Sequence, residues 1–192
     1  MNDVTTNYDL DRYVRDVRSV VDARLDASAT VARVSALNEK LYQSDFRMPD
    51  ELRRMAPEAP YTRNLVHQDP QGRFSIIALV WGPFQETAVH DHLSWCVMGV
   101  LEETCLALDY TRNDDGSDPS YADLSLASAQ LAPPGTVVGL TPPPNSNIHR
   151  ISNAGRKPAL TLHTYGDPGT RARIFDPASG RVEIRELVFH NI

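Results

Sequence analysis

Two histidines separated by one residue, His90 and His92, have the most evident chemical use in this 192-residue chain. They follow an apolar run, residues 74–81, that is typical of a buried strand. Side chains at positions i and i+2 of a strand point to the same face, so the two imidazoles would face together and Asp91 would face away. Imidazoles spaced in this way can occupy adjacent corners of a metal's coordination sphere. His149, in a second β-like segment, offers a third corner.

Three neutral histidines would leave coordination positions open for a substrate or for oxygen. Iron, zinc, nickel and manganese all bind such sites, so the ligand types alone do not fix the metal.

A hydroxyl, an imidazole and a phenol alternate along Thr161, His163 and Tyr165. If this segment is a strand, the three side chains share one face and can pass hydrogen bonds along it. Such a chain would fix the imidazole tautomer and aim the phenol. A polar strand face at the mouth of a barrel would show the same pattern.

Tyr61 and Arg63 precede the apolar run on another β-like segment. An arginine that faces inward there could bind a carboxylate, although a solvated arginine is the default interpretation of the residue alone. Cys96 and Cys105 are by default small buried hydrophobes. Arg173 is by default exposed to solvent.

The elements that position these residues begin with two helices. Apolar residues recur with a 3.6-residue period over residues 9–25 and again over residues 30–43. Asn7 or Asp9 could cap the first helix, and Thr30 the second. We expect the helices to cover one end of a β-barrel, with a partner-binding surface as the alternative.

From residue 61 onward, short β-rich runs alternate with turns rich in Gly, Pro, Asn and Asp. The predicted strands are 61–67, 73–81, 86–91, 94–100, 104–111, 129–132, 136–141, 147–152, 158–165, 172–176 and 181–189. Many short strands at near-regular spacing predict a mainly β fold, either a closed barrel or a jelly roll. We expect one domain, with residues 1–60 as a helical segment packed on a barrel formed by residues 61–192.

Composition limits the partners. The net charge is −6 and no basic stripe is present, so we expect no nucleic-acid partner. No run of eighteen apolar residues occurs and the first residues do not resemble a secretory signal, so we expect no membrane association. Two cysteines make no disulfide framework, which favours a reducing, cytoplasmic setting. We expect a monomer whose partners are small molecules.

The spacing around the histidines resembles the paired signature of cupin barrels. Gly82 precedes His90 and His92, and Pro134-Gly135 precedes His149. Such barrels often carry a carboxylate ligand four or five residues after the second histidine, where this chain has Cys96.

The order of segments resembles cysteine dioxygenase, a family of cupin-fold, non-haem iron thiol dioxygenases. The segments that carry the resemblance are Tyr61–Val66, Leu79–Gly82, His90–His92, His149-Arg150, Leu162–Tyr165, Phe175-Asp176, Gly180 and Phe189-His190. The resemblance implies a cupin double-stranded β-helix and an oxidoreductase of cysteine catabolism. An enzyme of this kind would convert L-cysteine and O2 to cysteine sulfinic acid.

The resemblance also implies a role for each candidate residue. His90, His92 and His149 would hold Fe(II), and Arg63 beside Tyr61 would bind the substrate carboxylate. Tyr165, His163 and Thr161 would form the outer-sphere hydroxyl–His–Tyr strand. Leu79 and Trp81 are candidates for the pocket wall, with core packing as an equally good interpretation.

The chain departs from the family's pattern in ways that leave alternatives open. Thr161 stands where the family usually has serine, which keeps the hydroxyl. Cys96 stands where animal enzymes have a cysteine joined to the active-site tyrosine as a thioether, but the loop before it is one residue shorter. Arg173 lies near the place where a sister group binds 3-mercaptopropionate. The alternatives are therefore a dioxygenase for that or another small thiol, and a non-catalytic metal-binding cupin that senses or stores a ligand.

Overall fold

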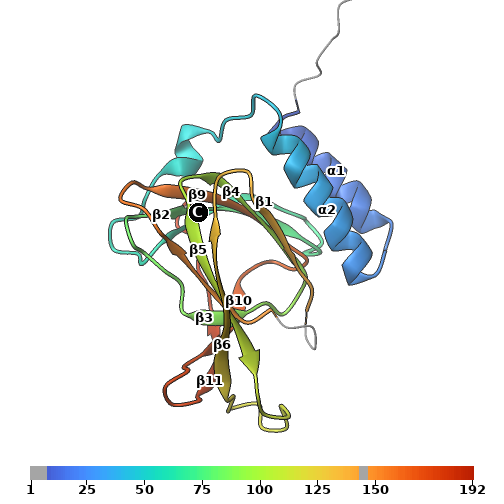
Figure 1. Cartoon of the computed structure of the whole chain (residues 1–192). Coiled ribbons are helices and arrows are strands. Elements are labelled where there is room, and N and C mark those ends of the chain that lie inside the picture. Colours follow the sequence, from blue (N-terminus) through green and yellow to red (C-terminus); the bar gives the residue numbers. More distant parts are fainter. Residues whose placement is uncertain (1–7, 143–146) are drawn as a thin grey trace, which may run out of the picture.

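Two helices begin the described part of the chain, and strands in two antiparallel sheets follow them (Figure 1). The computed structural model describes residues 8–142 and 147–192. Within these residues, no helix is both long enough and apolar enough to cross a bilayer.

Helices α1 (Leu10–Asp22) and α2 (Ala27–Tyr42) each begin at an aspartate cap. The side chain of Asp9 accepts a hydrogen bond from the backbone N–H of Arg12 at 2.8 Å, and Asp26 accepts one from Ala29 at 2.7 Å. These carboxylates satisfy N–H groups that have no partner within the helix. The prediction that Thr30 caps the second helix is wrong. Thr30 instead begins the buried stripe of α2, four residues inside the cap. The other predicted cap, Asn7, lies outside the described residues.

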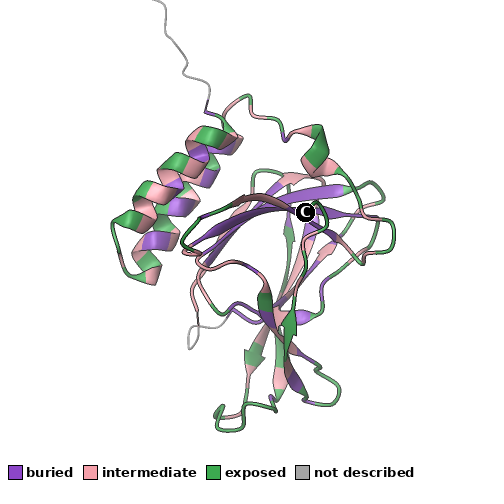
Figure 2. Ribbon diagram, turned by 180° about the vertical axis from the view of Figure 1, so that it is seen from behind, coloured by how far each residue is buried: buried purple, intermediate pink, exposed green. Residues whose placement is uncertain are grey.

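The first sheet has five strands in the order β1-β2-β9-β4-β7. Their bounds are β1 (Thr62–Gln68), β2 (Ser75–Trp81), β9 (Ala159–Tyr165), β4 (Cys96–Glu102) and β7 (Val137–Leu140). The central strands β2 and β9 are buried at every position because the helices cover one face of the sheet and the second sheet faces the other (Figure 2). A strand that is buried on both faces has a continuous apolar run, as β2 does.

The helices pack closely on this sheet. Tyr13, Val17, Val34 and Leu41 join a hydrophobic cluster with one face of β2, β4 and β9. Each such buried aliphatic side chain contributes about 1.5–3 kcal/mol. Gly99 on β4 permits the approach, because a Cβ there would lie 2.0 Å from the hydroxyl of Tyr42.

The second sheet has six strands in the order β11-β10-β3-β8-β5-β6. Their bounds are β11 (Val182–Glu186), β10 (Arg171–Phe175), β3 (Val89–Asp91), β8 (His149–Asn153), β5 (Cys105–Arg112) and β6 (Leu124–Ala132). Strand β6 begins five residues before the predicted 129, because pairing with β5 extends through a Ser- and Ala-rich stretch whose own strand signal is weak. Strand β3 is shorter than predicted and leaves Glu86 only an isolated bridge to Ser152.

The two sheets pack face to face as a jelly roll, which confirms the predicted mainly β fold. In the part of the chain that the structure describes, the sheets remain two separate ladders rather than one closed barrel. The space between them contains the second hydrophobic cluster and the candidate site. The helical segment shares a core with the first sheet, and the division at residue 60 stays a prediction.

Candidate metal centre and its cavity

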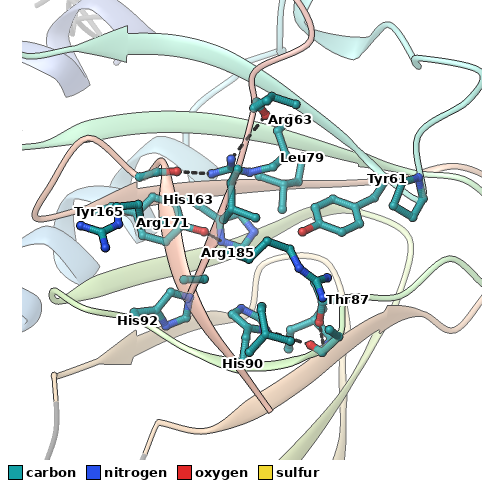
Figure 3. A pocket seen from close by; sticks show the side chains of 18 of the residues that line it. Tyr61, Arg63, Leu79, Thr87, His90, His92, His163, Tyr165, Arg171 and Arg185 are labelled. Carbon is teal, nitrogen blue, oxygen red and sulfur yellow. Dashed lines mark hydrogen bonds between the residues drawn. The ribbon is translucent and has the colours of Figure 1, made fainter. Parts of the chain in front are cut away.

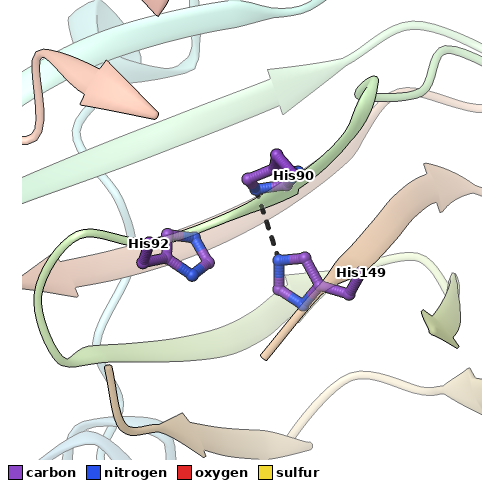
Figure 4. Close-up of side chains that lie close together, drawn as sticks. All are labelled: His90, His92 and His149. Atoms are coloured by element: carbon purple, nitrogen blue, oxygen red, sulfur yellow. Dashed lines mark hydrogen bonds between the residues drawn. The ribbon is translucent and has the colours of Figure 1, made fainter. Parts of the chain in front are cut away.

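The structure brings His90, His92 and His149 together (Figure 4). One ligand nitrogen from each lies within 4.8 Å of the others. His90 on β3 is the register partner of His149 on β8, and their Nε2 atoms are 3.3 Å apart. His92 follows β3 directly, and its ring centroid lies 5.0 Å from each of the other two. Among the described residues, no carboxylate or cysteine joins this group.

Strand alternation explains the orientation of these side chains and of their neighbours. Asp91 lies between the two histidines and is 1% exposed. Its carboxylate accepts hydrogen bonds from Arg173, which is its register partner on β10. Arg173 does not line the cavity. This corrects the expectation that it could bind a substrate, because alternation along β10 turns it toward Asp91.

Burial keeps the three imidazoles neutral. Removal from bulk water lowers the pKa of His90 to about 4 and lowers the pKa values of His92 and His149 well below 6.5. Neutral imidazole is the form that binds metals. The Nδ1 atom of His92 is buried and has no hydrogen-bond partner among the described residues. An orphaned buried nitrogen beside two other neutral imidazoles fits a bound metal ion.

The histidines form one side of a cavity of about 370 Å³ between the two sheets. Arg63, Leu79 and His163 face it from the first sheet, whereas His90 and His92 lie on the opposite side (Figure 3). Its lining includes most of the residues predicted from the sequence: Tyr61, Arg63, Leu79, Trp81, His90, His92, His149, His163 and Tyr165.

A chain of hydrogen bonds runs along β9 at the edge of this cavity. The indole N–H of Trp81 donates to Thr161 Oγ1 at 2.9 Å, and Thr161 Oγ1 lies 2.9 Å from His163 Nε2. His163 Nδ1 then lies 3.2 Å from the hydroxyl of Tyr165. Burial lowers the pKa of His163 to about 3 and raises the pKa of Tyr165 well above 10. Both groups are therefore neutral at physiological pH.

Arg63 is a buried guanidinium, with 4% of its surface exposed. Its Nη2 donates to the carbonyl of Gly169, and its Nη1 donates to the carbonyl of Val188 at 3.4 Å. No carboxylate among the described residues pairs with it. A buried charge without a counterion is costly, so this arrangement suits an anionic ligand.

Cys96 lies on β4 and is the register partner of Tyr165 on β9. Both residues are buried, and burial raises the pKa of the Cys96 thiol. Cys96 belongs to the hydrophobic cluster between the sheets and does not line the cavity itself. Because Cys96 and Tyr165 are paired in register, the shorter loop before β4 does not keep the two residues apart. Cys105 is buried elsewhere in the same cluster.

Several lining residues were not predicted from the sequence. Gly169, Arg171 and Ala172 come from the loop before β10 and from its start. Val188 and His190 come from the C-terminal segment. Of these, His190 alone falls in a segment that carries the family resemblance. Arg171 and Ala172 reach the cavity because β10 pairs with β3, whereas Val188 and His190 reach it because the C-terminal segment folds back onto β1.

Comparisons with known proteins agree with this geometry. The sequence model described as "Cysteine dioxygenase type I" matches residues 5–178. The chain is 31% identical to the human protein named "Cysteine dioxygenase type 1" over 169 residues, which cover 84% of this chain and 77% of the human one. The rat protein of that name is 30% identical over 137 residues, which cover 68% of this chain and 63% of the rat one.

Two solved structures are also similar in part. One is a "rmlc-like cupin protein" from Desulfovibrio desulfuricans, with a TM-score of 0.41 and 21% identity, covering 59% of this chain and 87% of the other. The second is a protein from Klebsiella pneumoniae with a "double-stranded beta-helix domain", with a TM-score of 0.45 and 14% identity, covering 74% of this chain and 98% of the other.

The family match covers both helices, the three histidines, Arg63 and the strand that carries Tyr165. It ends before β11 and the C-terminal segment. The matched length and the identity to the human protein together show that the chain belongs to the cysteine dioxygenase type I family.

Proposed function

We propose that this protein is a thiol dioxygenase that converts L-cysteine and O2 to cysteine sulfinic acid at an Fe(II) site. The observation that carries the proposal is the position of Arg63. A buried guanidinium that has no carboxylate partner among the described residues shares one cavity with three neutral, clustered imidazoles. A small molecule that bears both a metal-binding thiol and a carboxylate matches both features.

His90, His92 and His149 would hold the iron. Because all three are neutral, they leave the full charge of a divalent cation available to an anionic ligand. When bound there, Fe(II) supplies a Lewis acid that favours the thiolate form of the substrate and a redox centre for dioxygen. Both oxygen atoms of O2 enter the product, so a thiol and one O2 give one sulfinic acid.

Arg63 binds the substrate carboxylate in this proposal. Of the five N–H donors of a guanidinium, two are engaged by the carbonyls of Gly169 and Val188. The remaining donors are available for a charge-assisted pair with the carboxylate. The ring of Tyr61 stacks on Trp81 with centroids 4.9 Å apart, which supports a rigid wall beside Arg63.

Tyr165 positions the substrate or dioxygen through its hydroxyl. When Thr161 donates to Nε2 of neutral His163, the Nδ1–H of His163 donates to the phenol oxygen. The hydroxyl hydrogen of Tyr165 is then left to donate into the cavity. Trp81 favours this direction because it already occupies an acceptor site on Thr161.

We propose that the sulfur of Cys96 forms a thioether with the ring of Tyr165. O2 is the oxidant and accepts the two hydrogen atoms that are removed. Their positions as neighbours in the register of β4 and β9 support this. One S–C bond forms and two hydrogen atoms are lost, so the intact mass of the protein should fall by that amount during turnover. Cys96→Ser should abolish the loss. An unchanged mass after many turnovers would leave Cys96 as a packing residue.

The deciding experiment is oxygen uptake by anaerobically iron-loaded protein, with cysteine and 3-mercaptopropionate in parallel and sulfinate quantified. We expect uptake with cysteine that is matched one to one by sulfinate. Oxygen uptake with 3-mercaptopropionate but not with cysteine would show that 3-mercaptopropionate is the substrate. Iron-loaded protein that oxidises neither thiol would contradict the proposed activity and favour a cupin that binds without turnover.

A further inference from the structure

The C-terminal segment, residues 187–191, runs along the free edge of β1 and forms a wall of the cavity. Strand β1 is the outermost strand of the first sheet, so its outward backbone groups have no partner strand. Leu187, Val188 and His190 line the cavity. None of them belongs to a regular strand.

Four hydrogen bonds hold this segment to β1. The backbone N–H of His190 donates to the carbonyl of Arg63 at 2.9 Å, and the N–H of Arg63 donates to His190 Nδ1 at 3.0 Å. Two positions further along, the N–H of Leu65 donates to Asn191 Oδ1 at 2.8 Å, and Asn191 Nδ2 donates to the carbonyl of Leu65 at 3.0 Å. The amide of Asn191 therefore satisfies both outward backbone groups of Leu65.

The same segment also contacts the side chain of Arg63. The carbonyl of Val188 accepts from the guanidinium, and the ring of Phe189 lies 5.3 Å from its central carbon. Three consecutive residues, 188 to 190, therefore touch both the backbone and the side chain of one arginine. Figure 3 shows Arg63 with its two carbonyl partners above the cavity.

We infer that the C-terminal segment positions Arg63 for substrate binding and that Asn191 holds the segment in place through its hydrogen bonds to Leu65. This inference rests on the proposed function, because it assigns the orientation of the carboxylate-binding arginine to a segment far along the chain. Asn191 touches neither the histidines nor the cavity, so it is a positioning residue that acts through Arg63.

A segment that acts through Arg63 should matter only for thiols that carry a carboxylate. In Asn191→Ala, we expect the apparent affinity for cysteine to fall about five- to tenfold, from the loss of two hydrogen bonds. The affinity for 2-aminoethanethiol, which lacks the carboxylate, should stay unchanged. The metal content and kcat with saturating cysteine should also stay unchanged, which a general loss of structure would not permit.

The test is anaerobic binding of the two thiols to iron-loaded, full-length protein, followed by steady-state oxidation. Ile192→Ala is the matched control, since Ile192 is 84% exposed and adjacent in sequence. Asn191→Ser is a second variant that retains one polar atom and should give an intermediate loss. In the background of Arg63→Ala, Asn191→Ala should cause no further loss, because the residue through which it acts is gone.

Three outcomes would overturn the inference. If Asn191→Ala binds cysteine as tightly as a wild type that binds normally, the inference is refuted and the proposed function is not affected. An equal loss for both thiols would show that the segment supports the cavity in general rather than Arg63. Wild-type protein that binds iron but not cysteine would refute the proposed function and this inference with it.

Discussion

At the scale of single residues, the site combines neutral imidazoles and a neutral phenol with the buried guanidinium of Arg63. The imidazoles and the phenol are neutral because burial penalises their charged forms. Arg63 has no carboxylate partner among the described residues, so a buried guanidinium with free donors faces the cavity. This combination suits an anionic ligand.

The first prediction concerns Arg63. Replacing it with alanine should weaken the apparent affinity for cysteine about ten- to a hundredfold, because a charge-assisted pair is worth about 1.5–3 kcal/mol. Steady-state oxygen uptake at varied cysteine concentration measures this. Arg181→Ala is the control, since Arg181 lies at the surface beside Glu183. An unchanged affinity would argue against the carboxylate role.

The second prediction concerns Tyr165. In Tyr165→Phe the ring is retained and only the hydroxyl is lost, so turnover should fall at least tenfold while metal content stays within a factor of two. Parallel assays of sulfinate formation and bound iron measure the two effects. Loss of iron with turnover per iron preserved would assign Tyr165 a structural role instead.

At the scale of elements, the metal centre depends on a very short strand. Strand β3 has three residues and only one register pair with β8, which is the pair His90–His149. It has three register pairs with β10, including the pair Asp91–Arg173. Asp91 lies between His90 and His92 in the sequence, and its buried carboxylate accepts hydrogen bonds from Arg173. This pair therefore anchors β3 to β10 and helps to fix the positions of the two histidines.

The third prediction follows from this anchor. In Arg173→Met, metal affinity should fall about 10- to 100-fold, as for other partners that orient metal ligands. The unfolding free energy should fall as well, because Asp91 is left buried without its partner. Competition with a chromophoric chelator measures the affinity, and Arg181→Met is the control, since Arg181 is exposed just before β11. Equal affinities in the two variants would show that β3 is held by its backbone pairing alone.

At the scale of the whole molecule, β9 has hydrogen-bonded polar side chains on both faces of the first sheet. Thr164 faces the helices, where its hydroxyl lies 2.8 Å from the hydroxyl of Tyr13, and Asn38 donates to the same Tyr13 oxygen. The alternate residues, including His163, face the cavity. Enclosure between the two sheets thus keeps His163 buried, and we expect this burial to make the stability of the folded protein depend on pH.

The fourth prediction is a pH dependence. Unfolded histidine titrates near 6.5, whereas the pKa of His163 in the folded protein is about 3. Between these values the unfolded chain binds a proton that the folded chain does not, so acid favours unfolding. For the metal-free protein, we expect His163 to contribute a loss of about 1.6 kcal/mol in unfolding free energy between pH 6.5 and 5. Denaturant titrations at both values measure it. His163→Gln should show a smaller loss, and an identical pH dependence would contradict this origin.

Features that depend on neighbours along the chain could be predicted from the amino-acid sequence. Strand alternation predicted that His90 and His92 face together with Asp91 opposite, and that Thr161, His163 and Tyr165 share a face; the structure agrees on both points. Strand spacing also predicted a mainly β fold, with a closed barrel and a jelly roll as the two alternatives, and the structure has the jelly roll. These features are local because side-chain direction repeats every two residues regardless of the rest of the fold.

Contacts between distant segments, in contrast, could be seen only in the folded chain. The tertiary structure turned Arg173 toward Asp91, and it placed Val188 and His190 beside Arg63 across more than a hundred residues. No local pattern encodes these contacts, because they depend on which strand edges remain free after the sheets have formed and on how the chain returns to them. The histidines could thus be found from the sequence, whereas the C-terminal segment that contacts Arg63 became visible only in the folded molecule.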